Sequence, residues 1–265
     1  MENPPLLNDS ILVVAHPDDE ALWFSSLVEG VREIIVCYLN VKSDPSLSEG
    51  RRVSLSDHPL GSLSCLKLEE SEVFNAKNWY APTVTKYGID IKAGENKQKQ
   101  YKRNFYILKE TLYPRLKPYG HIFTHNPWGE YGHEEHVQLY RVIKSLQKDL
   151  DVTIWYPNYV SNKSLPLLQK TISNLSMQYI SMPTQTEMGT SLKHLYESNS
   201  CWTWHRDWEW SGDEAFLRED SQNDLLTGDR PVPLNFIRVK IRPQTHRRKK
   251  RSVLGRAIKR IQSLR

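Results

Sequence analysis

Residues able to bind a metal ion or move a proton stand together near the N-terminus of this 265-residue chain. His16, Asp18, Asp19 and Glu20 come directly after the apolar run at 11–15. His16 and Asp19 are three positions apart at a predicted strand-to-helix turn, so their side chains can converge on one point. A second interpretation stays open, because Asp18 or Asp19 can also cap the helix that follows.

A second group of this kind lies more than a hundred residues further along. His133 and His136 are also three positions apart, at the start of a predicted helix, and therefore share one face of it. Two histidines and a carboxylate with an open coordination position are typical of a catalytic zinc site, where a spare carboxylate such as Asp18 can act as a general base. The spacing excludes the H-E-x-x-H motif of zinc peptidases, and ordinary surface histidines remain the alternative.

The elements that must position these groups alternate between strands and helices. Short apolar runs predict strands, and apolar residues at three- and four-residue steps predict helices. The predicted strands are 11–15, 33–39, 71–76, 121–125 and 152–157. The predicted helices are 19–31, part of 51–68, 97–116 and 133–150, and residues 158–235 carry no clear pattern.

This alternation predicts an α/β fold in which helices cover both faces of a mostly parallel sheet. In such sheets the active site lies outside the carboxyl ends of the strands. Both polar groups directly follow predicted strands. We therefore expect them to share one site at that end of the sheet.

The composition is that of an ordinary globular protein, with 38% hydrophobic and 25% charged residues, and the length suits one main domain. No apolar run reaches the roughly 18–20 residues that span a bilayer, and the N-terminus has no secretory signal. The odd cysteine count, Cys37, Cys65 and Cys201, argues against a disulfide framework. These features predict a cytoplasmic protein.

Two motifs resemble those of a known family. The sequence A-H-P-D-D-E at 15–20, followed by Y-G-H-x-x-H at 131–136, is similar to the motif pair of the PIG-L/LmbE-like family. The resemblance covers mainly residues 10–160. It implies a Rossmann-like three-layer αβα sandwich and a metal-dependent N-deacetylase that acts on N-acetylglucosamine-type groups.

The resemblance also implies roles for single residues. The family's metal ligands match His16, Asp19 and His136, which would hold Zn2+, with Fe2+ as the alternative. Asp18 matches the general base that activates the attacking water.

Two further residues match the catalytic machinery of the family. His133 matches the histidine that steadies the tetrahedral intermediate and protonates the leaving amine. Tyr131 matches a tyrosine that polarises the substrate carbonyl in some members. Where the family commonly has H-P-D-H, this chain has Glu134 and Glu135 between its histidines, but the histidine spacing is kept.

The family's motifs for sugar recognition match this chain less well than its catalytic motifs do. The family's T-D-G-like stretch and its R-x-x-E have no clear counterparts here, and Arg52 is the candidate substrate contact. The segment CWTWHRDWEW alternates as a strand would and holds four tryptophans, Trp202, Trp204, Trp208 and Trp210. Indole faces can stack on sugar rings, which makes Trp202, Trp204 and His205 candidate substrate-binding residues; the alternative is that the indoles fill the core.

The C-terminus has a different charge from the rest of the chain. Residues 238–265 hold twelve of the 36 Lys and Arg and none of the 31 Asp and Glu. We expect a catalytic domain at 1–237 and, at 238–265, an edge strand followed by a basic amphipathic helix. Such a helix suits an anionic membrane surface, here the inner face of the membrane. A solvated tail or a partner-binding helix is the alternative, and the acidic body disfavours nucleic acid.

Together these features predict a zinc-dependent hydrolase that removes the N-acetyl group of an amino sugar in a glycolipid, glycan precursor or glycoconjugate. One rival is an amidase of another N-acyl or mycothiol-like conjugate. A second rival, of a different class, is a non-catalytic glycan-binding protein on the same fold.

Overall fold

The computed structural model describes residues 5–76, 79–172, 178–219 and 232–240. Seven strands form the central sheet, in the order β3-β2-β1-β6-β7-β10-β9. Their bounds are β1 Ser10–Val14, β2 Glu33–Asn40, β3 Leu63–Glu69, β6 His121–Thr124, β7 Thr153–Pro157, β9 Tyr179–Pro183 and β10 Asp213–Glu219. The first five strands in this order run parallel, and β10 is antiparallel to both of its neighbours.

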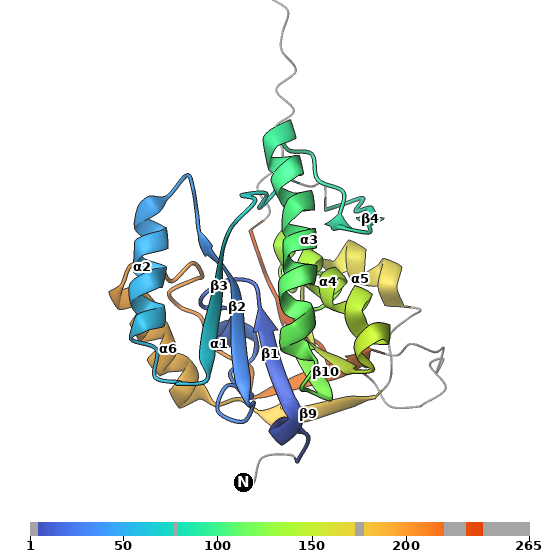
Figure 1. The fold of residues 1–265 in the computed structure, drawn as a ribbon. Helices are drawn as coiled ribbons and strands as arrows, with labels where there is room; N and C mark the ends of the chain where they lie inside the picture. Colours follow the sequence, from blue (N-terminus) through green and yellow to red (C-terminus); the bar gives the residue numbers. More distant parts are fainter. Residues whose placement is uncertain (1–4, 77–78, 173–177, 220–231, 241–265) are drawn as a thin grey trace, which may run out of the picture.

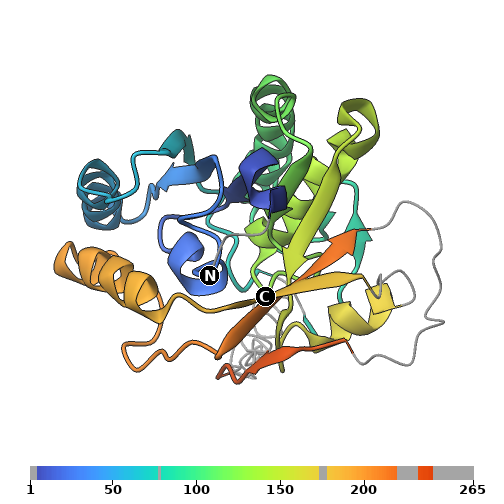
Figure 2. The same cartoon turned by 90° about the horizontal axis from the view of Figure 1, so that it is seen from below.

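Helices cover both faces of this sheet (Figures 1 and 2). They are α1 Asp19–Trp23, α2 Pro45–Ser56, α3 Glu95–Leu116, α4 Glu134–Leu150, α5 Leu165–Thr171 and α6 Thr186–Ser198, preceded by a 3-10 turn at Pro5–Asp9. Two short pairs stand outside the main sheet: β4 Val84–Thr85 with β5 Gly88–Ile89, and β8 Tyr159–Ser161 with β11 Asn235–Ile237.

Strand β1 shows why the sheet needs two helical layers. Its apolar side chains alternate between the two faces. Ile11 and Val13 join the core beneath α3 and α4, and Leu12 and Val14 join the core on the α1 side. Helix α6 packs outside α1 and beside α2. The predicted three-layer α/β fold is therefore confirmed.

The order of the strands sets the position of the site. From β1 the chain proceeds through β2 to β3 on one side, and later through β6 to β7 on the other. Strands β1 and β6 are thus the adjacent pair at which the order reverses, and ligands of such sheets bind outside the carboxyl ends of that pair. The segments that follow these two strands are the two polar groups of the sequence.

Some predicted elements need correction. No strand occupies 71–76; the third strand is β3, and the backbone amides of Ser71 and Asn75 donate to carboxylates of α4 instead of to a sheet. Helix α1 ends at Trp23, far short of 31. Helix α2 begins earlier than expected, because Asp44 caps it and Pro45 occupies its first turn.

The C-terminal prediction also changes. Strand β11 ends before the predicted edge strand at 238, and 238–240 form no strand. The basic amphipathic helix falls outside the described residues. Among the described helices, none has both the length and the apolar character that crossing a bilayer requires.

Candidate metal centre

Three predicted ligands meet where β1 and β6 end. His16 follows β1, Asp19 opens α1, and His136 lies in the first turn of α4. The Nδ1 atom of His16 lies 3.3 Å from Asp19 Oδ2, and His136 Nε2 lies 3.3 Å from both Asp19 Oδ1 and His16 Nδ1. Donor atoms arranged tetrahedrally at about 2.0–2.2 Å from a zinc ion are about 3.3–3.6 Å apart. The two histidines approach different oxygens of Asp19, and the three side chains are close enough to converge on one divalent metal ion. We refer to these residues as the triad.

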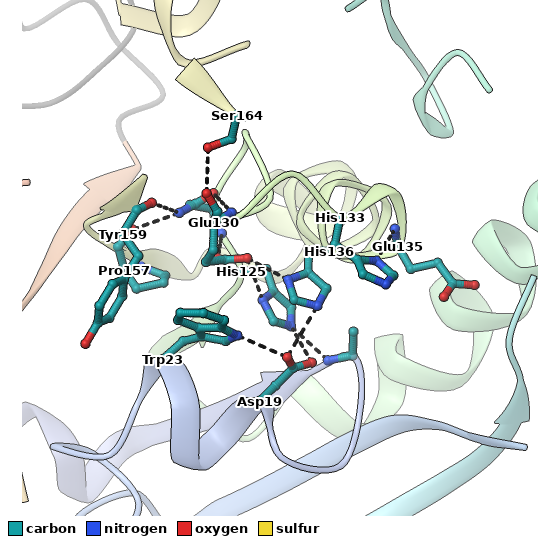
Figure 3. A network of polar contacts seen from close by, with 12 residues as sticks. Asp19, Trp23, His125, Glu130, His133, Glu135, His136, Pro157, Tyr159 and Ser164 are labelled. Carbon is teal, nitrogen blue, oxygen red and sulfur yellow. Dashed lines mark hydrogen bonds and ion pairs between the residues drawn. The ribbon is translucent and has the colours of Figure 1, made fainter. Parts of the chain in front are cut away.

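Neighbouring carboxylates orient the two triad histidines so that one ring nitrogen of each is available to bind a metal. Glu130 Oε2 lies 2.6 Å from His136 Nδ1, and because a carboxylate only accepts, that nitrogen carries the proton. His136 Nε2 therefore presents its lone pair to Asp19. In Figure 3, Glu130 and Asp19 lie on opposite sides of the imidazole. A carboxylate that fixes a histidine in this way is the usual support of a metal ligand.

His16 is oriented in the same manner by Glu135. Glu135 Oε2 lies 3.1 Å from His16 Nε2, which leaves Nδ1 for the triad. The backbone amide of Ser71 donates to the other oxygen of Glu135 at 2.6 Å. Glu135 thus supports His16 from one of the positions at which this chain departs from the family's H-P-D-H.

The charge around the triad favours a cation. Burial would lower the pKa of His16, but Glu70, Asp19 and Glu135 surround the ring and raise it to about 10. Although burial opposes the charge of Asp19, the neighbouring His136 holds its pKa well below the usual value. The carboxylates thus stabilise a positive charge at this point, as a proton or as a metal ion.

His125 lies against the triad, and the sequence analysis missed it. Its Nε2 atom is 3.4 Å from Asp19 Oδ2, and its ring stacks on His136 with centroids 3.7 Å apart. The amide of Ala15 donates to that Nε2 at 2.9 Å, so the lone pair is already used. Its Nδ1 then donates to Glu130 at 3.1 Å, which makes His125 a support for Glu130 rather than a ligand. Its place directly after a strand was the only signal in the sequence.

A neighbouring acidic group suits a metal less well. Among the described residues, three groups have ligand atoms within 4.8 Å of one another: His16 with His133 and His136, Asp19 with His125 and His136, and the acidic group of His16, Glu70 and Glu135. The buried Arg51, however, forms an ion pair with the partly buried Glu70, so a guanidinium already neutralises that carboxylate. Arg52, the predicted substrate contact, lies on the exposed side of α2 and pairs with Glu49. The arginine that faces the site is therefore Arg51, not Arg52.

Asp18 stands beside the triad in a strained backbone conformation, with φ of 98°. Its side chain does not cap α1, as the alternative interpretation required. Instead, Oδ2 accepts from the amide of Thr203 at 2.9 Å and from its hydroxyl at 2.7 Å. Burial and the charge of Asp19 raise the pKa of Asp18 to about 7, a value that suits a general base near neutral pH. Glu20 is also buried and accepts from the Tyr196 hydroxyl at 2.6 Å.

His133 lies next to the triad histidines without being one of them. Its ring centroid is 4.7 Å from that of His16 and 4.6 Å from that of His136. The Nδ1 atom accepts from the amide of Glu135, so the proton of the neutral ring is on Nε2. Burial and the two neighbouring histidines hold the pKa of His133 well below its usual value. In this arrangement the neutral ring can donate a hydrogen bond through Nε2.

Aromatic side chains line the partly exposed side of the site. Tyr131 packs on Trp23 with centroids 5.6 Å apart and on Trp204 at 4.6 Å. It also lies 5.3 Å from the ring of His136, and Phe74 stacks on His133 at 4.9 Å. Tyr131, as predicted from the motif, is thus adjacent to the triad.

The segment that holds the four tryptophans forms a loop and not the strand that its alternation predicted. All four are half-buried, and Trp202, Trp204 and Trp208 pack against the core on the α1 side. Trp204 reaches Tyr131, with the exposed His205 beside it at 5.0 Å. Trp202 also packs against the contact between α1 and α6. Of the predicted substrate residues, Trp204 therefore lies nearest to the triad.

Known proteins resemble this chain in sequence and in fold. No protein-family model matches the chain. In sequence it is similar to uncharacterized protein L374 of Acanthamoeba polyphaga mimivirus, with 26% identity over 165 residues, which are 61% of this chain and 68% of that protein.

Among solved structures, the chain is similar to a deacetylase from the biosynthesis of teicoplanin, with a TM-score of 0.50, 10% identity and coverage of 81% of this chain and 99% of that one. The zinc-inhibited form of teicoplanin deacetylase Orf2 gives a TM-score of 0.47, with 10% identity over 81% and 99% of the two chains. At such identity, the first of these likenesses establishes a shared fold.

Proposed function

We propose that this protein is a metal-dependent N-deacetylase of the PIG-L/LmbE-like type, with Zn2+ as its metal and an N-acetylated amino sugar as its substrate. The observation that carries the proposal is the triad of His16, Asp19 and His136. Its two imidazole nitrogens lie 3.3 Å from each other and each 3.3 Å from an oxygen of Asp19, both rings are oriented by carboxylates, and the carboxyl group of Asp18, which is not a ligand, lies beside them. The deacetylase names of proteins with a similar fold agree with it.

Hydrolysis of an amide needs a nucleophile, stabilisation of the developing oxyanion and a proton for the leaving nitrogen. A divalent metal held by the triad would supply Lewis acidity toward the carbonyl and toward water. Everything else has to come from side chains of this chain.

Asp18 is the proposed base. Both bonds from Thr203 go to Oδ2, so Oδ1 is the oxygen that can take a proton from the attacking water. The same carboxyl group then returns this proton to the leaving amine. This assignment differs from the role that the family resemblance gives His133, because a neutral ring with its only proton on Nε2 would become an imidazolate on donating it.

His133 and Tyr131 are the proposed stabilisers of the oxyanion. The Nε2–H of His133 can donate a hydrogen bond to the carbonyl oxygen as charge develops there. Tyr131 is adjacent to the same ring and to His136. Trp204, which contacts Tyr131, is the proposed platform for the sugar ring.

The test is acetate release. Metal-stripped protein, reloaded with Zn2+ or Fe2+, is incubated with free and lipid-linked N-acetyl sugars, and acetate is measured against the stripped protein. We expect metal-dependent release from at least one N-acetyl sugar. Release only from other N-acyl amides would support the amidase rival. Sugar binding without any hydrolysis, measured by calorimetry, would support a glycan-binding protein and overturn the proposal.

A separate proposal concerns the basic segment 238–265 and the place at which the protein binds its substrate. Its twelve cations would bind an anionic membrane surface, each contributing about 1 kcal/mol near the surface. Removal of residues 246–265 should then weaken binding to phosphatidylserine vesicles but not to phosphatidylcholine vesicles. Equal binding before and after truncation would rule this role out.

A further inference from the structure

The loop that leads into α4 has an unusual backbone. Gly129, Glu130 and Gly132 all have positive φ, at 68°, 40° and 85°. The left-handed region is costly for a residue such as Glu130, and it persists only where surrounding contacts determine it. This loop carries Glu130 and Tyr131 and ends at His133. Contacts from elsewhere must therefore hold it in place.

The turn before α5 supplies two of these contacts. The Ser164 hydroxyl donates to the Glu130 carbonyl at 2.6 Å, as Figure 3 shows. The ammonium of Lys163 donates to the Gly132 carbonyl at 2.6 Å and to Asn75 Oδ1 at 2.8 Å. The stem of Lys163 also packs on Gly132, since a Cβ there would lie 3.0–3.2 Å from three of its carbons. Lys163 thus connects three segments that are distant in the sequence.

Burial of the Lys163 ammonium at this place costs free energy of folding. Its side chain is buried, and burial lowers its pKa to about 8, although Glu134 partly offsets this. Among the described residues, no carboxylate lies within ion-pair distance of its ammonium. Burial of an ammonium without such a partner opposes folding, so the contacts that Lys163 makes must compensate.

Two sets of contacts connect Lys163 with His133. Gly132, whose carbonyl Lys163 holds, directly precedes His133 in the chain. The ring of Phe74, which stacks on His133 with an interplanar angle of 14°, has the Lys163 ammonium 4.4 Å from its centroid. The Trp79 ring lies 5.1 Å from the same ammonium. Backbone and aromatic contacts therefore converge on one imidazole.

We propose that Lys163 is a positioning residue that holds the Gly132 carbonyl and the Phe74 ring and thereby fixes the His133 ring beside the triad. The proposal rests on the proposed function only for its effect on catalysis. Lys163 contacts none of the triad residues. Glu130 and Glu135 orient these, and Glu130 has its own hydrogen bonds from Ser164 and Asn126. Removal of Lys163 should therefore disturb His133 and leave metal binding intact.

The experiment compares Lys163→Met with Lys170→Met in the full chain. The ammonium of Lys170, on α5, also donates a hydrogen bond to a backbone carbonyl, that of Pro82 at 2.5 Å, but this bond lies away from the site. We expect Lys163→Met to lower kcat by about 100-fold, as small misplacements of catalytic groups do, with KM and metal affinity unchanged. Lys170→Met should leave kcat unchanged.

A second measurement does not depend on activity. Diethyl pyrocarbonate modifies neutral, accessible imidazoles, and peptide mass spectrometry can follow its reaction with His133. We expect severalfold faster modification of His133 in Lys163→Met and the wild-type rate in Lys170→Met. If the wild type releases no acetate from any substrate, the proposed function fails, and the modification rates still test the positioning role.

Equal kcat and equal His133 modification in the two variants would overturn the proposal. So would a parallel loss of kcat and metal affinity in Lys163→Met, because that outcome means general loosening of the site. If Lys163→Met does not fold, Asn75→Ala provides the test, since it removes only one partner of the ammonium. It should increase His133 modification and lower kcat to a smaller extent.

Discussion

The triad and the tryptophan loop flank the same site but are built differently. In the triad, Glu135 and Glu130 orient His16 and His136, and all the side chains involved are buried. In the loop 202–210, the indoles are half-buried and no regular element holds them. The buried indole nitrogens of Trp204 and Trp208 have no hydrogen-bond partner among the described residues. Hydrogen bonds specify the triad, whereas the loop depends mainly on apolar packing, with one hydrogen bond each from the indoles of Trp202 and Trp210 to backbone carbonyls.

The difference indicates a division of labour. Chemistry needs donor atoms fixed to within a fraction of an ångström, and rigid strands and helices with oriented side chains provide this. Recognition of a substrate tolerates adjustment, and loops commonly provide it. The link between the two sides is Thr203, whose amide and hydroxyl both bind Asp18. Substitutions on the triad side should therefore remove activity, and those on the loop side should change it by degrees.

The largest effect is expected from His136→Ala. Loss of one of three ligands should reduce the metal content of purified protein to background and abolish acetate release. His121→Ala, at the opposite end of β6, is the matched control and should retain its metal. Full metal content in His136→Ala, measured by elemental analysis, would contradict the assignment of the triad.

A smaller effect is expected from Glu130→Gln. The amide keeps the size of the side chain, but one of its two ends is an NH2 donor. It therefore cannot accept both from the two histidines and from the backbone amide of Asn126, as the two oxygens of the carboxylate do. Metal affinity should fall by about 10- to 100-fold, the usual effect of losing a group that orients a ligand. Competition with a chelator measures it, with Glu49→Gln on the exposed face of α2 as control. Unchanged affinity would mean that His136 needs no support from Glu130.

Thr203→Val tests the link between the two sides. It removes the hydroxyl donor to Asp18 and keeps the amide donor. Because a hydrogen bond to a charged group is worth about 1.5–3 kcal/mol, kcat should fall by about tenfold or more, with metal affinity unchanged. Thr203→Ser should restore the rate. If Ser and Val behave alike, the hydroxyl has no part in placing Asp18.

The smallest effect is expected from Trp204→Leu on the loop side. Leu keeps an apolar side chain against Tyr131 but loses the flat face for a sugar ring. We expect KM to rise several-fold, with kcat and metal content close to wild type. Trp202→Leu, which lies against α6, serves as the comparison and should leave KM unchanged. A fall in kcat without a change in KM would place Trp204 among the catalytic supports instead.

The parts predicted from the sequence are those that local pattern determines. The strands β1, β2, β6 and β7 and the helices α3 and α4 follow from apolar spacing. The residues of the triad lie in two motifs that each keep their own spacing, and the choice of His136 instead of His133 as a ligand follows from the resemblance to the PIG-L/LmbE-like family. The fact that those motifs meet depends on the order of the strands, which alternation of elements already indicates.

What the sequence analysis missed depends on contacts between distant segments. Glu135, a departure from the family motif, supports His16, which lies 119 positions away. Arg51 and Arg52 are neighbours of the same type, and only the packing of α2 decides which one is buried. The segment 71–76 has strand-like residues, but its amides bind the carboxylates of α4. None of these partners can be read from local spacing.

The central claim, a metal-dependent deacetylase with Asp18 as its base, is tested most directly by one paired measurement. Metal content and acetate release are determined on the same preparations of wild type and Asp18→Asn, with an N-acetyl sugar that the wild type hydrolyses. The account predicts one metal ion per chain in both proteins and acetate release only from the wild type. Undiminished release by Asp18→Asn, or release by a wild type that contains no metal, would contradict it.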